Sequence, residues 1–143
     1  MTLKKGGQVN EERYLELTGR LVAGETAVSE EWTAVFESLA NHYFATDTVA
    51  LLKLVAEANG LPLQNKAAKQ MRTYFQGVAA FRQAAHDDAV ALFVALLAES
   101  VLTPHLRARA LNARAVVCRV TGRLDEAIAG YEESLTLWEE QGN

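Results

Sequence analysis

The sequence predicts an all-α fold of about seven helices, and three observations support that class. Apolar residues recur at the three- and four-residue spacing of amphipathic helices, and no stretch alternates with the period of two that is typical of a strand. Only two prolines and nine glycines interrupt a chain rich in Ala, Leu and Glu, which favour helix. Short breakers separate the helical segments, so neighbouring helices are expected to fold back as antiparallel hairpins.

The N-terminal part is expected to supply a tail, a leading helix and one hairpin. These segments are a flexible tail at 1–10, a leading segment at 11–28 and a hairpin at 29–62. The leading helix runs from Glu11 to Ala23 and ends at Gly24, a typical residue after a helix C-terminus. In the hairpin, "ATD" at 45–47 separates a helix at about 29–44 from one at about 48–59.

A second hairpin is expected at 65–100. A long helix covers about 65–84, and "QAAH" at 83–86 forms the corner that follows it. Either Asp87 or Asp88 can cap the next helix, which runs to about Ser100.

The third hairpin, at 103–140, has the clearest boundaries. Thr103 is a predicted N-cap with Pro104 in the first turn, and the helix continues to Val120. "TGR" at 121–123 breaks the chain before the last helix. One stripe of that helix is apolar at spacings of four, three, four and three residues, formed by Leu124, Ile128, Tyr131, Leu135 and Trp138.

Composition favours one domain in a reducing compartment. A chain of 143 residues that is half apolar can bury a single core. The lone Cys118 excludes an internal disulfide, which fits the cytoplasm. The longest apolar run, 89–98, is too short to cross a bilayer, and no apolar core of a secretory signal follows the N-terminus. A cytoplasmic protein without a membrane segment is therefore expected.

The last two hairpins have similar sequences. "DDAVALFVALLAES" at 87–100 aligns with "DEAIAGYEESLTLW" at 125–138, a displacement of 38 residues. This displacement pairs Gly77 with Ala115, Ala89 with Ala127, and Phe93 with Tyr131. A weaker third copy, "DTVALLKLVAEAN" at 47–59, is displaced by 41 residues.

This pattern resembles the tetratricopeptide repeat (TPR) family. The family's helix–turn–helix unit carries a large residue, a small residue four positions later, and then a small residue and an aromatic in the second helix. The matching residues are Leu111, Ala115, Ala127 and Tyr131 in the last copy, and Thr73, Gly77, Ala89 and Phe93 in the middle copy. In the first copy only Trp32 fits well, because Phe36 replaces the small residue.

The resemblance covers about 29–143 and is strongest from residue 66 onward. Displacements of 38 and 41 exceed the family's usual 34, and Arg114 stands where the family usually has an apolar residue. Both departures indicate a long-helix variety similar to arrays in bacterial signalling and transcriptional regulators.

The resemblance implies one domain over 1–143, a right-handed stack of hairpins known as an α-solenoid. Small residues would let paired helices approach to about 8–10 Å. Phe93 and Tyr131 would then fill the space between successive hairpins. An unrelated helical bundle with coincidental alanines is the alternative.

The sequence contains no pattern typical of an enzyme, metal site or cofactor site. His42, His86 and His105 lie far apart and form no paired-ligand motif, and no glycine-rich phosphate loop occurs. Cys118 falls beside Ala115 on the inward side of its helix, as a core thiol would.

Charge separates the first helices of the last two hairpins from the second helices. Nine of the fourteen Lys and Arg residues lie in or just after the first helices: Lys66, Lys69, Arg72, Arg82, Arg107, Arg109, Arg114, Arg119 and Arg123. The second helices are acidic. Since first helices line the concave face in the TPR family, the resemblance implies a basic groove that attracts an acidic peptide or protein. The implied concave-face residues are Met71, Tyr74, Val78, Phe81, Arg109, Asn112, Val116 and Arg119.

The leading hypothesis is therefore a non-enzymatic protein-interaction module, and three alternatives stay open. The arginines can instead pair with neighbouring acids as a solvated network. The chain can form a homo-oligomer, with an apolar strip on the C-terminal hairpin buried by a partner copy. Nucleic-acid binding is disfavoured by the net charge of −4.

Overall fold

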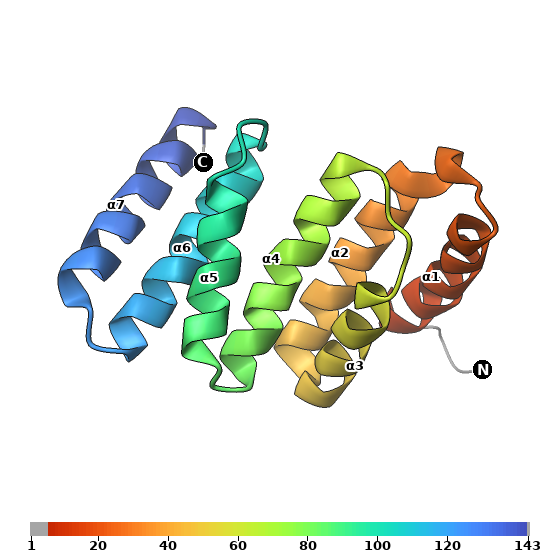
Figure 1. Ribbon diagram of the computed structural model, residues 1–143, viewed down its shortest axis with the longest axis horizontal. Coiled ribbons are helices and arrows are strands. Elements are labelled where there is room, and N and C mark those ends of the chain that lie inside the picture. The colour runs from red at the N-terminus through yellow and green to blue at the C-terminus, as the bar shows by residue number, and fades with distance from the viewer. Residues whose placement is uncertain (1–5, 143) are drawn as a thin grey trace. The chain divides into compact units, whose positions relative to one another are not determined.

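The computed structural model describes residues 6–142, with side chains from Asn10 onward, and its regular elements are all helices (Figure 1). They are α1 (Gly6–Val22), the short 3-10 helix η1 (Thr26–Val28), α2 (Ser29–Thr46), α3 (Thr48–Asn59), α4 (Lys66–Arg82), α5 (His86–Leu97), α6 (Pro104–Val120) and α7 (Leu124–Glu140). No strand occurs between residues 6 and 142. The predicted all-α class and the seven helices are confirmed for this range.

Two compact units divide the chain, with the boundary inside α4. Unit 1 extends to Arg72 and unit 2 begins at Thr73. Each unit has its own core, and each is described by itself below. The organisation of 1–143 as a single domain stays a prediction.

Unit 1 is held together by an aromatic cluster between α1 and α2. The rings of Trp32 and Phe36 are stacked, with centroids 4.9 Å apart, and Tyr14 lies 5.9 Å from Trp32. Trp32 Nε1 donates a hydrogen bond to Thr18 Oγ1 at 3.0 Å, so the buried indole is satisfied. Phe36 thus occupies space in an aromatic stack, which explains why this copy has no small residue there.

Helix α1 begins at Gly6, five residues earlier than predicted. The flexible-tail prediction is therefore wrong for residues 6–10, while residues 1–5 lie outside the described range. Two glycines lower helix propensity there, but tertiary contacts compensate. Asn10 Nδ2 donates a hydrogen bond to Ser38 Oγ at 2.9 Å, and the hydroxyl of Tyr43 donates one to Glu11. Both hydrogen bonds join α1 to α2.

The start of α5 differs from the prediction in its cap. Neither Asp87 nor Asp88 is the N-cap; that position belongs to Ala85, which offers no side-chain hydrogen bond. Both aspartates lie in the first turn, where their negative charge interacts favourably with the positive end of the helix dipole. The helix also ends at Leu97 rather than at Ser100.

The 38-residue displacement reappears in the backbone of the turns. Ala84 and Gly122 both have positive φ, 60° and 83°. One residue later, the amide of Ala85 donates to Ala80 O at 2.9 Å and that of Arg123 donates to Cys118 O at 2.7 Å. The α4–α5 and α6–α7 turns therefore have the same conformation at positions 38 residues apart.

Helix starts follow the same displacement. Asn65 Oδ1 accepts from the amide of Ala68 at 3.0 Å before α4, and Thr103 Oγ1 accepts from the amide of Leu106 at 3.2 Å before α6. The predicted Thr103 cap is thus confirmed. An asparagine and a threonine perform the same capping role in equivalent positions.

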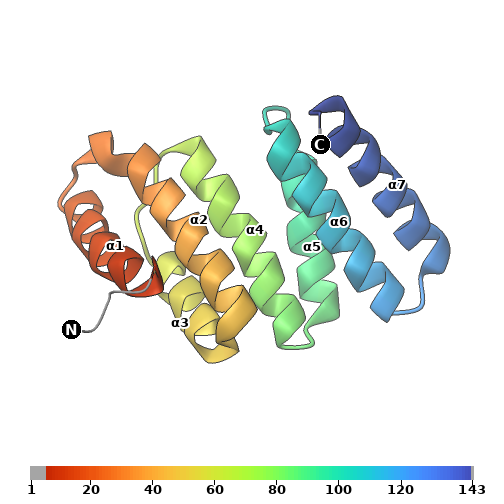
Figure 2. The same ribbon diagram turned by 180° about the vertical axis from the view of Figure 1, so that it is seen from behind.

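Unit 2 has small residues where its helices approach closely. A Cβ placed on Gly130 of α7 would lie 3.0 Å from the Cβ of Ala115 in α6, and one on Gly77 would lie 2.5 Å from the Phe93 ring. The hydroxyl of Ser134 donates to Ala108 O at 2.9 Å, which fixes α7 on α6. Figures 1 and 2, seen from opposite sides, place α5 in front of α6 and then behind it, so these helices occupy different layers of unit 2.

Phe93 and Tyr131, the equivalent aromatic residues of the last two hairpins, lie in different environments. Phe93 is buried on Gly77 of its own hairpin, 5.9 Å from the Tyr74 ring, so it does not simply fill a gap between hairpins. Tyr131, its counterpart, is only half-buried. Ala115 replaces Gly77 in the third hairpin, and its methyl group occupies the place where a ring could lie.

Candidate protein-interaction surface

Helix α7 has two distinct apolar faces. Its small residues Ala127, Gly130 and Ser134 face α6. The large residues form a second face, named here the α7 stripe: Leu124, Ile128, Tyr131, Leu135 and Trp138. This arrangement lets α7 pack closely on α6 while its large side chains remain on another side of the helix.

Most of the α7 stripe is open to solvent. Leu124, Ile128 and Leu135 are 58%, 57% and 59% exposed, and Tyr131 and Trp138 are half-buried. Within the described part of unit 2, α6 is the helix that packs on α7. The ring of His105 meets Trp138 edge-on at 5.2 Å and closes one end of the stripe. The apolar strip predicted on the C-terminal hairpin is therefore present, and its burial by a second copy stays a prediction.

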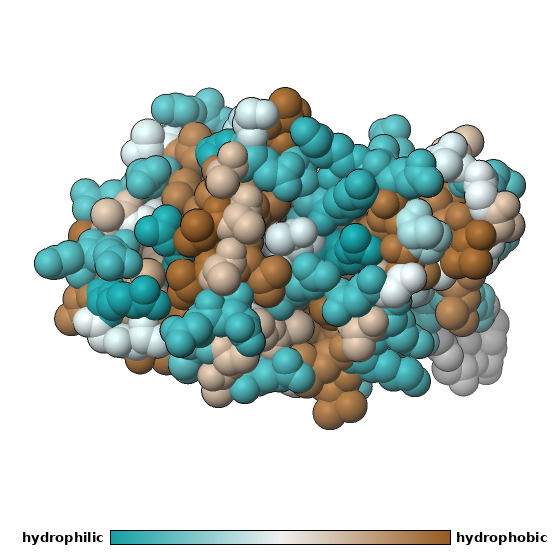
Figure 3. All heavy atoms as spheres, viewed as in Figure 1, coloured by the Kyte–Doolittle hydropathy of each residue, from teal (hydrophilic) through white to brown (hydrophobic). Residues whose placement is uncertain are grey.

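Hydrophobic residues also gather elsewhere on unit 2. On the side drawn in Figure 3, they form a band over the region of α5 and α7, bordered by hydrophilic residues. Val94 of α5 is one of the exposed apolar residues of this unit. The α7 stripe differs from single exposed apolar residues because its members follow one helix face over four turns.

The charges of α6 and α7 are opposite. Helix α7 contains acids and no base: Asp125, Glu126, Glu132, Glu133, Glu139 and Glu140. Helix α6 contains arginines and no acid: Arg107, Arg109, Arg114 and Arg119. Asp125, Glu132 and Glu139 recur every seven residues and are exposed, so they form a carboxylate row beside the stripe.

The residues expected on a concave face have mixed environments. Met71, in unit 1, and Tyr74 and Val78, in unit 2, are buried. Phe81, Arg109 and Val116 are half-buried, and Asn112 and Arg119 are exposed. The buried three contribute to the cores in which they lie, so the surface available to a ligand is smaller than the predicted set.

Arg109 is held against aromatic rings inside unit 2. Its guanidinium carbon lies 4.6 Å from the centre of the Tyr74 ring and 5.6 Å from that of Phe75. At this distance a cation is attracted by the ring quadrupole. The structure thus brings Arg109 and Tyr74 together, and their pairing gives Arg109 a packing role.

Two other arginines donate hydrogen bonds to carbonyls at the end of the helix that precedes their own. Arg72 donates to the carbonyls of Ala58 and Leu61 at 3.1 and 3.0 Å, within unit 1. Arg107 donates to Leu97 O and Glu99 O at 3.2 and 3.3 Å, within unit 2. Both satisfy carbonyls at a helix C-terminus, where positive charge is also favourable. No sequence signal identifies these roles, because the acceptors are backbone atoms eight or more residues away.

Arg114 lines two hollows between α6 and α7. The larger, about 560 Å³, is also lined by Glu132 and Glu133, and the smaller, about 110 Å³, by Glu126 and Glu133. Arg123 lies 3.9 Å from Glu126. The arginines of α6 therefore divide among helix termination, aromatic packing and the acidic side of α7, while Arg119 is exposed. The basic concave groove stays a prediction.

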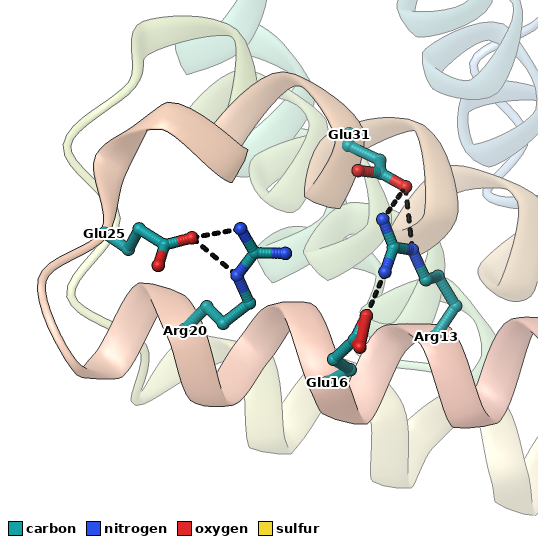
Figure 4. Close-up of polar contacts among 5 residues, drawn as sticks. All are labelled: Arg13, Glu16, Arg20, Glu25 and Glu31. Carbon is teal, nitrogen blue, oxygen red and sulfur yellow. Dashed lines mark hydrogen bonds and ion pairs between the residues drawn. The ribbon is translucent and has the colours of Figure 1, made fainter.

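Exposed polar contacts in unit 1 join α1 to α2 through Glu31 and to the N-cap of η1 through Glu25 (Figure 4). Arg13 contacts both Glu16 and Glu31, and Arg20 contacts Glu25. These ion pairs are solvent-exposed. Exposed pairs contribute little individually, so they orient the helices more than they stabilise them.

A hollow of about 370 Å³ in unit 1 is lined by residues of α1, α2 and α3, including Glu11, Tyr14, Tyr43 and Glu57. Burial raises the pKa of Tyr14 to about 12. Burial, followed by the contact with Glu11, also raises the pKa of Tyr43. Both phenols are therefore protonated at physiological pH.

No group of three metal-ligating side chains occurs among the residues that the structure describes. None of the described helices is long and apolar enough to cross a bilayer. Cys118 is buried in α6, as the prediction of a core thiol requires. No protein-family model, curated protein or solved structure matches this chain.

Proposed function

We propose that this protein is a non-enzymatic, cytoplasmic protein-interaction module built as a TPR-like stack of helix hairpins. Support for the repeat comes from the equivalent turns at Ala84 and Gly122 and from the small residues at Gly77 and Ala115. The observation that carries the interaction function is the exposure of the α7 stripe.

The α7 stripe has the pattern of a helix-docking surface. Spacings of four, three, four and three place its side chains on one face, as at the seam between paired helices. Burying a leucine or isoleucine contributes roughly 1.5–3 kcal/mol, so the three exposed members alone offer substantial binding energy to a partner. A contiguous apolar face of this kind marks an interaction site more often than single exposed residues do.

A second surface, for acidic peptides, is supported by exposed Asn112 and Arg119 on α6 beside half-buried Val116. This is the remaining part of the predicted concave groove. Arg119 is the residue to test, because Arg109 also packs on Tyr74 and its replacement would disturb the fold. Homo-oligomerisation through α7 is the competing function, and nucleic-acid binding is disfavoured by the net charge of −4.

Affinity purification with three forms of the protein tests the proposal. The parent, Ile128→Glu/Leu135→Glu and Arg119→Glu are first matched for helix content and unfolding midpoint. Each polypeptide retained by the parent is then expressed alone and titrated against all three. Direct binding that one surface variant loses supports an interaction module and identifies its surface. Retained polypeptides that bind all three forms equally would contradict both surfaces.

Light scattering distinguishes the proposed function from the competing one, homo-oligomerisation through α7. A monomer is expected for the parent at micromolar concentration. A dimer that Ile128→Glu/Leu135→Glu converts to a monomer would instead assign the α7 stripe to self-association.

A further inference from the structure

The face of α5 that is equivalent to the α7 stripe is less exposed to solvent than the stripe. By the 38-residue displacement, Leu124, Ile128, Tyr131 and Leu135 correspond to His86, Val90, Phe93 and Leu97. Phe93 is 1% exposed, and the other three α5 residues are half-buried. Three of the four α7 counterparts are instead 57–59% exposed. The same helix face is thus covered in one hairpin and uncovered in the next.

On α5, Phe93 contacts Gly77 and Tyr74 of α4, and the other helix that packs on α5 within unit 2 is α6. It is a basic amphipathic helix without acids, whereas α5 has Asp87 and Asp88 in its first turn. Near the other end of α5, Arg107 of α6 donates to the carbonyls of Leu97 and Glu99. The two helices therefore carry opposite charges, and an arginine of α6 lies at the C-terminus of α5.

Helix α7 offers the same features to a partner. Its stripe is apolar, its carboxylate row lies beside the stripe, and Glu139 and Glu140 add negative charge at its C-terminal end. A second α7 would bring its own six acids toward these carboxylates, and like charges disfavour that pairing. Charge complementarity favours a basic helix instead.

We propose that the α7 stripe binds a basic amphipathic helix of another polypeptide. The partner helix has apolar residues at three- and four-residue spacing, Lys or Arg beside them, and no acidic residues in its contact face. An arginine near its start reaches the carbonyls at the end of α7, as Arg107 does for α5. This inference rests on the proposed interaction function and specifies the chemistry of its partner.

A peptide with the sequence of residues 104–120 is the defined probe, because α6 is a basic amphipathic helix of this chain that packs on α5. Cys118 is replaced by serine in the peptide to prevent oxidation. The control peptide has all four arginines replaced by glutamate, which retains high helix propensity. Trp138 reports binding by fluorescence, while Trp32 is fully buried in unit 1 and serves as an internal constant.

The basic peptide is expected to saturate the change in Trp138 emission, and the acidic peptide to bind at least about tenfold more weakly. Raising the salt concentration should weaken the basic peptide further, because the flanking charges are exposed. Ile128→Glu/Leu135→Glu should abolish the response. Val101→Glu, at a site 64% exposed outside α7, is the matched control and should bind like the parent.

Charge reversal tests the specificity directly. Glu132→Lys/Glu139→Lys should weaken the basic peptide and strengthen the acidic one, reversing their order. Failure of the basic peptide to bind, equal binding of both peptides, or a dimer through α7 would overturn the inference. If partners from the affinity experiment bind through Arg119 while the basic peptide does not bind, the interaction function stands and only this inference fails.

Discussion

The ring of Phe93 lies so close to Gly77 that a Cβ at residue 77 would be 2.5 Å from Phe93 Cε1. Phe93 cannot easily move away, because it is buried and its ring centre is 5.9 Å from that of Tyr74. The absence of one methyl group on α4 therefore determines how α5 packs.

Gly77→Ala is expected to destabilise the protein despite the better helix propensity of alanine. Propensity contributes up to about 1 kcal/mol in favour of alanine. Overpacking against the buried ring costs about 1–3 kcal/mol, so we expect a net loss of roughly 1–2 kcal/mol in the free energy of unfolding. Urea unfolding measures it. Gly19→Ala is the control: nothing lies within 4 Å of its Cβ, and it should gain about 0.5–1 kcal/mol.

The turns at Ala84 and Gly122 have the same conformation. Replacing alanine by glycine in one turn and glycine by alanine in the other should therefore change the free energy of unfolding in opposite directions. Both residues have positive φ, which costs an L-residue roughly 1–2 kcal/mol and glycine almost nothing. Ala84→Gly should therefore raise the unfolding free energy, and Gly122→Ala should lower it by about 1 kcal/mol. Thermal unfolding of the two variants checks this pair. Changes of the same sign would mean that the turns are not equivalent.

Arg107 and Arg119 lie on the same helix but should differ in their contribution to stability. Arg107→Ala leaves the carbonyls of Leu97 and Glu99 without this donor and should cost about 1 kcal/mol. Arg119 is exposed, so Arg119→Ala should change stability by less than about 0.5 kcal/mol. Guanidinium unfolding at matched ionic strength compares them, and equal effects would contradict the helix-terminating role of Arg107.

Tyr14 should make the protein sensitive to alkali. Burial raises its pKa from 10.0 to about 12 in the folded state. Between these values the unfolded chain has released the phenolic proton while the folded chain retains it, so stability falls as pH rises from about 10 to 12. Tyr14→Phe should lose stability less steeply across this window in unfolding titrations. Parallel slopes for parent and variant would contradict the shift.

Much of the fold follows from local signals in the sequence. Helix periods, the Thr103 cap and the Gly122 turn define α6 and α7 because these determinants act over a few residues. The start of α1 at Gly6 escaped prediction because a tertiary bond, from Asn10 to Ser38, opposes the local propensity. The cap at Ala85 carries no side-chain signal either.

The candidate surface was harder to predict than the helices. Periodicity identifies the α7 stripe but does not say whether it faces α6, since that depends on the smaller residues Ala127, Gly130 and Ser134 between its members. The arginines of α6 looked alike in sequence, yet Arg107 binds carbonyls and Arg109 packs on Tyr74. Charge counting cannot separate such roles, because they depend on which atoms the fold brings near each guanidinium.

Hydroxyl-radical footprinting of Leu124, Ile128 and Leu135 tests the central claim most directly. All three side chains should react readily in the free monomer, and saturation with the basic 104–120 peptide should protect them while Val101 stays reactive. Protection already present in the free monomer, or unchanged reactivity at saturation, would contradict an open helix-binding face on α7.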